Sequence, residues 1–153
     1  MRKEIWKDVI GFEGLYRISN YGNTKSVDRK VYHSGNNKFH DLKGAMLSTR
    51  INNAGYVSVR LNKKGKTYTR FVHRLMAKAF IPNPLNKKYI NHRDGDKRNN
   101  ILKNLEWVTH SENIRHAYRL GLIPSYKYIP SNIRRTFCDQ KKNSENENGK
   151  REN

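Results

Sequence analysis

The pattern of hydrophobic and polar positions predicts short strands in the first third of the chain. Across residues 5–18, apolar and aromatic residues alternate with polar ones, and Gly11 and Gly14 would interrupt a helix. We therefore expect short strands joined by turns. Residues 23–31 are expected to form another extended segment, followed by a loop at Ser-Gly-Asn-Asn, residues 34–37.

The clearest pattern is a hairpin in the middle of the chain. Residues 56–61 alternate strictly, a turn is expected at residues 62–66, and residues 67–72 form the return strand. The apolar face carries Val57, Val59 and Leu61. The other face carries Tyr56, Ser58 and Arg60. One face is expected to pack on a core while the other faces outward.

An amphipathic helix is predicted directly after the hairpin. Four apolar residues recur at i, i+3, i+4 and i+7, which places them on one stripe of a helix: Val72, Leu75, Met76 and Ala79. The helix is expected to stop before the Pro-Asn-Pro segment at residues 82–84. Three aromatic residues are expected to join this stripe in a small core: Trp6, Phe12 and Trp107.

The following segment has the pattern of a strand, a long polar loop, a second strand and a helix. In order, these elements are expected at residues 88–92, 93–103, 105–109 and 111–120. Thr109 or Ser111 would cap the start of the helix, and Gly121 would end it. The whole arrangement occupies little more than thirty residues.

The composition adds a strong positive charge to this picture. The 153 residues suffice for one compact domain, and 32 Lys and Arg against 13 Asp and Glu give a net charge of +19. A field of this sign attracts polyanions, so nucleic acid or an anionic membrane surface is the expected partner. The sequence has no apolar run long enough to cross a membrane and no signal-peptide pattern. An intracellular protein that binds nucleic acid is expected.

Cysteine content and the C-terminal composition narrow the possibilities further. A single cysteine, Cys138, excludes an internal disulfide and a zinc site built from several thiolates. Residues 139–153 contain no apolar side chain. A tail over residues 123–153 is therefore expected to be basic or polar and largely disordered.

Four polar side chains occur in the order of a known nuclease motif. Asn91 and His92 end one expected strand, Asn104 precedes the next, and Asn113 lies in the helix. With the run Asn-Leu-Glu-Trp-Val-Thr that begins at Asn104, this set resembles the HNH endonucleases, and in particular the branch found in phage intron-associated homing enzymes. Residues 5–22 resemble the small nuclease-associated module, NUMOD-like, that often precedes this motif.

The resemblance implies an α+β fold, in which short antiparallel strands and a hairpin precede a ββα-metal nuclease motif. The expected domains are a strand-rich module at 1–54, an HNH nuclease domain at 55–122 with its ββα-metal core at 88–120, and the tail at 123–153. The implied activity is hydrolysis of phosphodiester bonds in double-stranded DNA, by nicking or cleavage, with no small-molecule cofactor. A monomer is expected, acting in the cytoplasm at the nucleoid of a bacterial or phage-infected cell.

The family assigns a role to each polar residue of the motif. A neutral imidazole suits proton abstraction from water near pH 7, so His92 is the expected general base. Asn104 is expected to fix the loop and to orient His92 by hydrogen bonds. Asn91 and Asn113 are the expected protein ligands of one Mg²⁺ or Mn²⁺ ion, since amide oxygens are hard donors.

Position 91 departs from the usual family pattern. Relatives often have Asp or His there, whereas Asn91 leaves both expected ligands neutral. Metal binding is then expected to depend on the DNA phosphate. Two alternatives stay open: a catalytically inactive DNA-binding protein on the same scaffold, and replacement of a ligand by His110 or His116, which flank Asn113.

A set of basic residues is expected to contact DNA. Lys63, Lys64 and Lys66 in the hairpin turn are expected on phosphates, and Arg60 on the strand face could reach a guanine edge. A solvated turn and a solvated strand face are the alternatives. His73 is interpreted as a structural or phosphate-binding residue. The remaining expected contacts are Arg70, Arg74, Arg93, Lys97, Arg98 and Arg115.

Overall fold

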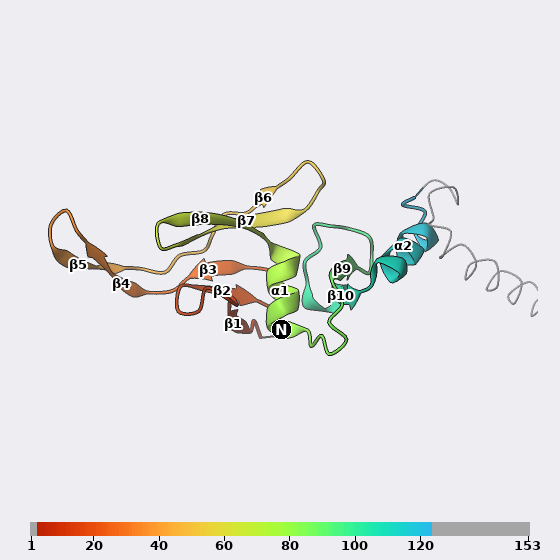
Figure 1. Ribbon diagram of the computed structural model, residues 1–153, viewed down its shortest axis with the longest axis horizontal. Helices are drawn as coiled ribbons and strands as arrows, with labels where there is room; N and C mark the ends of the chain where they lie inside the picture. Colours follow the sequence, from red (N-terminus) through yellow and green to blue (C-terminus); the bar gives the residue numbers. More distant parts are fainter. Residues whose placement is uncertain (1–2, 124–153) are drawn as a thin grey trace, which may run out of the picture. The chain divides into compact units, whose positions relative to one another are not determined.

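The computed structural model describes residues 3–123 of the chain. They form two compact units, one ending at Val108 and the other beginning at Thr109. The tail expected over residues 123–153 lies outside the described residues except for its first position. Short antiparallel strands combined with two α-helices confirm the expected α+β class (Figure 1).

The first unit begins with a three-stranded antiparallel sheet in the order β1-β2-β3. Its strands are β1 (Trp6–Asp8), β2 (Tyr16–Ser19) and β3 (Thr24–Ser26). The turn between β1 and β2 requires left-handed backbone at Gly11 and Gly14, with φ of 83° and 69°, which glycine adopts without a steric cost. The strands expected in this segment are therefore confirmed.

A second hairpin, β4 (Arg29–His33) and β5 (Lys38–Leu42), follows as a ribbon of its own (Figure 1). Every residue of β5 is exposed. A ribbon without a buried face has no apolar alternation to reveal it, and the sequence pattern predicted only part of β4. The loop expected at residues 34–37 is the turn between the two strands.

The predicted central hairpin is confirmed, with a tighter turn. It is built from β7 (Val57–Lys63) and β8 (Lys66–Phe71), and the short β6 (Arg50–Ile51) pairs with β7 on its other side. The turn is the dipeptide Lys64-Gly65 rather than residues 62–66, with φ of 51° and 71°. Positive φ at both central positions is the conformation that two-residue hairpin turns prefer.

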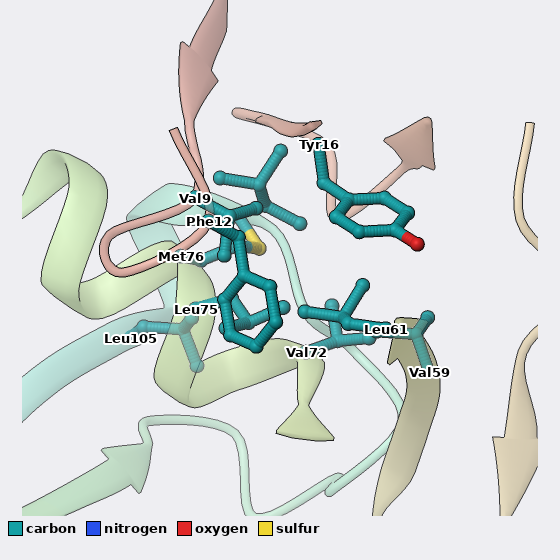
Figure 2. Close-up of a cluster of buried hydrophobic side chains, with 10 residues drawn as sticks. Val9, Phe12, Tyr16, Val59, Leu61, Val72, Leu75, Met76 and Leu105 are labelled. Atoms are coloured by element: carbon teal, nitrogen blue, oxygen red, sulfur yellow. The ribbon is translucent and has the colours of Figure 1, made fainter. Parts of the chain in front are cut away.

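The predicted helix is α1 (Val72–Phe80), which ends at the residue before Ile81. Its buried stripe packs against the β1-β2-β3 sheet and the β6-β7-β8 sheet (Figure 2). The resulting core joins residues from either side of the boundary expected at residues 54 and 55. Its members are Val9, Phe12, Tyr16, Ile18, Val59, Leu61, Val72, Leu75, Met76 and Leu105.

Two of the three aromatic residues expected in the core lie at its margin instead. Phe12 is buried, whereas Trp6 and Trp107 are half-buried. The Nζ of Lys25 lies 4.2 Å from the ring centroid of Trp6. The indole nitrogen of Trp107 donates a hydrogen bond of 3.1 Å to the carbonyl of Ile81. Both indoles are therefore half-buried and engaged in polar contacts.

The nuclease-like segment begins with the antiparallel pair β9 (Tyr89–His92) and β10 (Leu105–Val108). A long loop joins the two strands and ends in the short 3₁₀ helix η1 (Leu102–Asn104). These elements confirm the predicted strand, loop and strand.

The second unit contains α2 (His110–Arg119). Thr109 accepts a hydrogen bond from the backbone of Glu112, while Glu112 bonds back to the backbone of Thr109. This capping box satisfies two backbone donors at the start of the helix and selects Thr109 over Ser111 as the cap. Across residues 3–123, no helix is both long and apolar enough to span a membrane.

Candidate active site

His92 is the last residue of β9 and lies 5% exposed. Its Nε2 is 3.1 Å from Oδ1 of Asn100, in the loop between β9 and β10. The Nδ2 of Asn100 donates to the carbonyl of Arg98 at 3.1 Å. Because a carbonyl can only accept, this contact turns Oδ1 of Asn100 toward His92. The Nε2 of His92 therefore carries the ring proton.

Asn104 stabilises the loop rather than the His92 ring. Its Oδ1 accepts from the backbone of Asp94 at 3.1 Å, and its Nδ2 donates to Oδ1 of Asp94 at 2.9 Å and to the carbonyl of Asn99 at 2.8 Å. The loop-fixing role expected of Asn104 agrees with these bonds. The expected hydrogen bond to His92 comes from Asn100 instead, because Asn104 is turned toward the start of the loop.

The hydrogen bonds within this loop also act on the Asp94 carboxylate. Burial raises the pKa of Asp94, but hydrogen bonds from Asn104 and Asn99 outweigh it and hold the pKa below its ordinary value. Asp94 therefore stays ionised near neutral pH and continues to accept both amide protons. The ionised carboxylate strengthens these bonds and so holds the loop in one conformation.

Asn91 lies opposite Glu106 in the register of β9 and β10. Its Nδ2 donates to Oε1 of Glu106 at 2.9 Å, and Oε2 of Glu106 is 3.2 Å from Nε of Arg93. With its nitrogen held by a carboxylate, Asn91 presents its carbonyl oxygen as the atom able to coordinate a cation. That oxygen is a hard donor, which fits Mg²⁺ or Mn²⁺.

The sequence reasoning missed two residues of this site: Glu106, which bonds to Asn91, and Asn100, which bonds to His92. Glu106 could have been found, because pairing the two predicted strands from His92 and Leu105 outward sets it opposite Asn91. Asn100 gave no such signal, since it lies in a polar loop rich in asparagine and aspartate.

His73, on α1, belongs to a buried ring cluster beside His92, which agrees with the structural role expected for it and not with the alternative of a DNA phosphate contact. It is 5% exposed, and its ring centroid lies 5.2 Å from that of His92, 5.1 Å from Tyr56 and 5.6 Å from Phe71. Burial, followed by the charges of His92 and Arg74, lowers the pKa of His73 to about 3. The ring is thus neutral and structural near pH 7.

The three lysines of the hairpin turn differ in whether their side chains are exposed or bonded within the protein. Lys64 and Lys66 are exposed at the turn. Lys63 points back, with its Nζ donating to the carbonyl of Gly11 at 2.5 Å and lying 5.6 Å from the ring centroid of Phe12. Lys63 therefore ties the hairpin to the β1–β2 turn, which removes it from the expected set of freely available phosphate contacts.

The outward strand face expected at Tyr56, Ser58 and Arg60 is only partly available. Ser58 is 7% exposed and donates to the carbonyl of Arg50 at 3.2 Å, because β6 covers that edge. Tyr56 is half-buried in the ring cluster with His73. Arg60 is the member of this face that remains exposed.

Three other cations expected to contact DNA also make contacts within the protein. The Nζ of Lys97 donates to the carbonyl of Ala54 at 3.0 Å and lies 5.0 Å from the ring centroid of Tyr56. The guanidinium carbon of Arg70 lies 5.1 Å from the ring centroid of Tyr68. Arg93 pairs with Glu106, as described above. These three side chains are nevertheless exposed, as are Arg74 and Arg98 on the first unit.

Arg74 also lines a shallow hollow of about 660 Å³ with three lysines. These lysines are Lys78, Lys87 and Lys88.

In the second unit, Asn113 and Arg115 are half-buried residues of α2. The first unit thus assembles Asn91, His92 and Asn104 on two paired strands and their connecting loop.

Comparison with known proteins agrees with this arrangement. Residues 4–62 match the NUMOD4 motif, and residues 70–115 match an HNH endonuclease family. The chain is 34% identical over 118 residues to DNA endonuclease I-HmuI of Bacillus phage SP01, an alignment covering 77% of this chain and 60% of that protein. It is 39% identical over 131 residues to the uncharacterized HNH endonuclease L247 of Acanthamoeba polyphaga mimivirus, covering 82% of this chain and 29% of that protein.

A solved structure is similar as well. The structure reporting DNA binding and cleavage by the HNH homing endonuclease I-HmuI matches with a TM-score of 0.64 and 33% sequence identity, over 80% of this chain and 63% of that chain. The chain thus spans less than two thirds of these relatives. The two matched regions occur in the order expected from the sequence, which confirms that resemblance: the chain belongs to the HNH endonuclease family and carries a NUMOD4 motif ahead of its HNH region.

Proposed function

We propose that this chain is a metal-dependent endonuclease that hydrolyses phosphodiester bonds of double-stranded DNA. The observation that supports it most is the buried His92, held through Nε2 by Asn100 and followed by a loop fixed by Asn104. With Nε2 donating to Asn100, Nδ1 is the ring nitrogen left to accept a proton. A histidine held in one orientation suits general base catalysis better than a mobile one.

In this proposal His92 removes a proton from the water that attacks phosphorus. Asn104 keeps the loop, and therefore the partners of His92, in place. The side chain of Asn100 accepts the Nε2 proton in a hydrogen bond and so leaves Nδ1 for the water. The exposed cations, Lys64 and Lys66 among them, neutralise DNA phosphates as part of a chain with net charge +19.

Asn91 and Asn113 would hold one divalent cation, Mg²⁺ or Mn²⁺. For Asn91 the support is its orientation by Glu106, and for Asn113 it is the resemblance to the family motif. When bound, such an ion stabilises the negative charge that develops on the phosphate oxygens during hydrolysis. Glu106 brings a carboxylate next to the neutral Asn91, which adds negative charge where many relatives have an acidic ligand.

The enzyme is proposed to act as a single chain, on DNA in the cytoplasm of a bacterial or phage-infected cell. The competing function is DNA binding without cleavage. The neutral side chain at position 91 favours that alternative, whereas the Glu106 carboxylate beside it and the organised His92 favour catalysis.

A nicking assay on supercoiled plasmid tests the proposal. We expect cleavage with Mg²⁺ and its loss on addition of EDTA. We expect His92→Ala to lower the rate by at least about 100-fold, the usual worth of a general base, while fluorescence anisotropy shows DNA affinity within a few-fold of the parent. His40→Ala, at an exposed histidine of β5, is the matched control and should cut normally.

Two results would contradict the proposal. A parental protein that binds duplex DNA but never nicks it, at any Mg²⁺ or Mn²⁺ concentration, would establish the non-catalytic alternative. Parental cutting by His92→Ala would remove His92 as the base.

A further inference from the structure

We propose that Asn100 is a positioning residue for His92, and that the β2–β3 turn of the NUMOD4 region holds Asn100 in place. The inference rests on the proposed role of His92 as general base. It assigns to the N-terminal region a part in catalysis: support of the loop that orients the base.

The first step is the hydrogen bond between Asn100 and His92. Asn100 is 7% exposed, and its Oδ1 lies 3.1 Å from Nε2 of His92. The carbonyl of Arg98 accepts both the backbone N–H of Asn100 at 2.9 Å and its Nδ2 at 3.1 Å. These two hydrogen bonds to Arg98, in the same loop, therefore fix the orientation of the side-chain amide of Asn100. This geometry keeps the proton on Nε2 and the lone pair on Nδ1 of His92.

The second step concerns the other neighbours of His92. The rings of His73 and Tyr56 lie 5.2 Å and 6.3 Å from it, centroid to centroid. They pack against the imidazole through ring contacts. A ring held by packing alone can still flip about its Cβ–Cγ bond or exchange tautomers, and a directional hydrogen bond opposes both changes. Asn100 supplies that bond.

The third step leads from Asn100 to the N-terminal region. Gly22, in the turn between β2 and β3, has a φ of +86°. A Cβ added there would lie 3.0 Å from the backbone oxygen of Asn100 and 3.3 Å from its Cβ. The neighbouring Asn20 accepts a hydrogen bond of 3.2 Å from the backbone of Leu102. The turn thus contacts the loop at residues 100 and 102, immediately after the Arg98 anchor.

Substitutions at position 100 test the hydrogen bond. Asn100→Ala removes the acceptor, and we expect kcat for nicking to fall at least about 10-fold with KM for DNA within about 2-fold, because orientation of the base matters in the chemical step. Asn100→Asp keeps an oxygen acceptor for His92, so it should recover a large part of the lost kcat. The control, Asn36→Ala, removes an exposed amide in the turn of the β4–β5 hairpin, whose side chain contacts His40 rather than His92.

The nitrogen chemical shifts of the His92 imidazole report its tautomer directly. Loss of a residue with only a general structural role would not change them. In the parent, Nε2 of His92 should resonate as a protonated nitrogen and Nδ1 as an unprotonated one. In Asn100→Ala, both signals should move toward the average of the two tautomers. In Asn36→Ala they should stay at their parental positions.

Two glycine substitutions test the support from the turn. Gly22→Ala and Gly11→Ala introduce a similar backbone strain, since φ is +86° and +83° at these positions. A Cβ at Gly11 meets nothing within 4 Å, whereas one at Gly22 presses on Asn100. Because of this contact, we expect Gly22→Ala to melt below Gly11→Ala. Measured well below both melting temperatures, a reduced kcat and shifted His92 nitrogen signals are expected only in Gly22→Ala.

The outcomes separate this inference from the proposed function. Parental cutting by His92→Ala would remove the base itself. If His92→Ala is inactive while Asn100→Ala keeps the parental kcat and nitrogen signals, only the positioning role is wrong. Equal effects of Gly22→Ala and Gly11→Ala on kcat and on the His92 signals would overturn the support from the β2–β3 turn.

Discussion

At the scale of single residues, the three buried amides of the HNH region are distinguished by their partners. Asn91 bonds to a carboxylate, Asn100 to an imidazole, and Asn104 to Asp94 and the backbone of its own loop. In the proposed mechanism, the same side-chain chemistry therefore provides a metal ligand at Asn91, a positioning contact for the base at Asn100 and closure of the loop at Asn104. Which role each has follows from the atom it faces.

The different roles proposed for Asn113, a metal ligand, and Asn104, a loop residue, predict different responses of their variants to added Mn²⁺. Asn113→Ala should lose most nicking activity, and a raised Mn²⁺ concentration should restore part of it, because removal of a ligand mainly weakens ion binding. Asn104→Ala should lose activity without such recovery, because its bonds hold the loop. Nicking rates across a Mn²⁺ titration, with Mn²⁺ binding followed by electron paramagnetic resonance, check this. Equal recovery in both variants would contradict the two roles.

His73 predicts a pH dependence of stability. Its pKa is about 3 in the folded protein and about 6.5 in an unfolded chain. Between these values the unfolded state binds more protons, so the contribution of neutral His73 is complete above pH 6.5 and is lost as pH falls toward 3. At pH 5 the loss is roughly 2 kcal/mol.

Urea unfolding of His73→Phe at pH 7 and pH 5 measures this contribution. The variant keeps a ring in the cluster but cannot be protonated, so its stability should fall less between the two pH values than that of the parent. His40→Ala, at an exposed site, should fall as the parent does. An identical pH dependence in His73→Phe and the parent would show that His73 is not buried in its neutral form.

At the scale of elements, the β7–β8 hairpin carries two exposed lysines that we propose contact phosphates, Lys64 and Lys66, and one that bonds within the protein, Lys63. Replacing Lys64 and Lys66 together by Ser should reduce the magnitude of the log-log salt slope of DNA binding by about 0.9 for each phosphate that these lysines neutralise. Binding to unrelated duplexes should weaken by the same factor, because phosphate contacts carry no base information.

Lys63→Ser is the matched control within the same hairpin. Its Nζ bonds to the carbonyl of Gly11, so this variant should lower the melting temperature and leave the salt slope nearly unchanged. Salt titrations of affinity for two duplexes and thermal melts measure the two effects. An unchanged slope in the Lys64 and Lys66 double variant would exclude this turn from the DNA-binding surface.

At the scale of the whole molecule, the first unit depends on one core shared by the NUMOD4 and HNH regions. Val9, Phe12 and Ile18 pack in the same cluster as Val59 and Met76 (Figure 2). Burial of each such side chain contributes about 1.5–3 kcal/mol. The burial of three such side chains together contributes a free energy comparable to the total free energy of unfolding of a small domain.

A chain of residues 55–153 is therefore expected not to fold. It lacks the partners of Val59, Leu61 and Met76, and it also lacks the turn that contacts Asn100. Circular dichroism and a proton-nitrogen NMR spectrum, recorded beside the full chain, would detect this as missing cooperative unfolding and poorly dispersed signals. A cooperatively folded fragment would show that the HNH region is an independent domain.

The sequence by itself determined the elements with a one-sided apolar pattern. The stripe from Val72 to Ala79 defined α1 and the alternation from residue 57 defined β7. The start of α2 was defined to within two residues, at Thr109 or Ser111, and the structure selected Thr109 as the cap. These signals are local, because periodicity and capping depend on residues a few positions apart. The order Asn91, His92, Asn104 and Asn113 indicated the family in the same way.

Only the tertiary structure decided which polar groups meet. It paired Lys63 with Gly11, covered Ser58 with β6, placed His73 beside His92, and brought the turn at Gly22 against Asn100. These partners lie between 8 and 78 positions apart in the sequence. Their hydrogen bonds and packing depend on the shared core, because the core holds the sheets and α1 against one another. No local pattern of hydrophobic and polar residues encodes such distances.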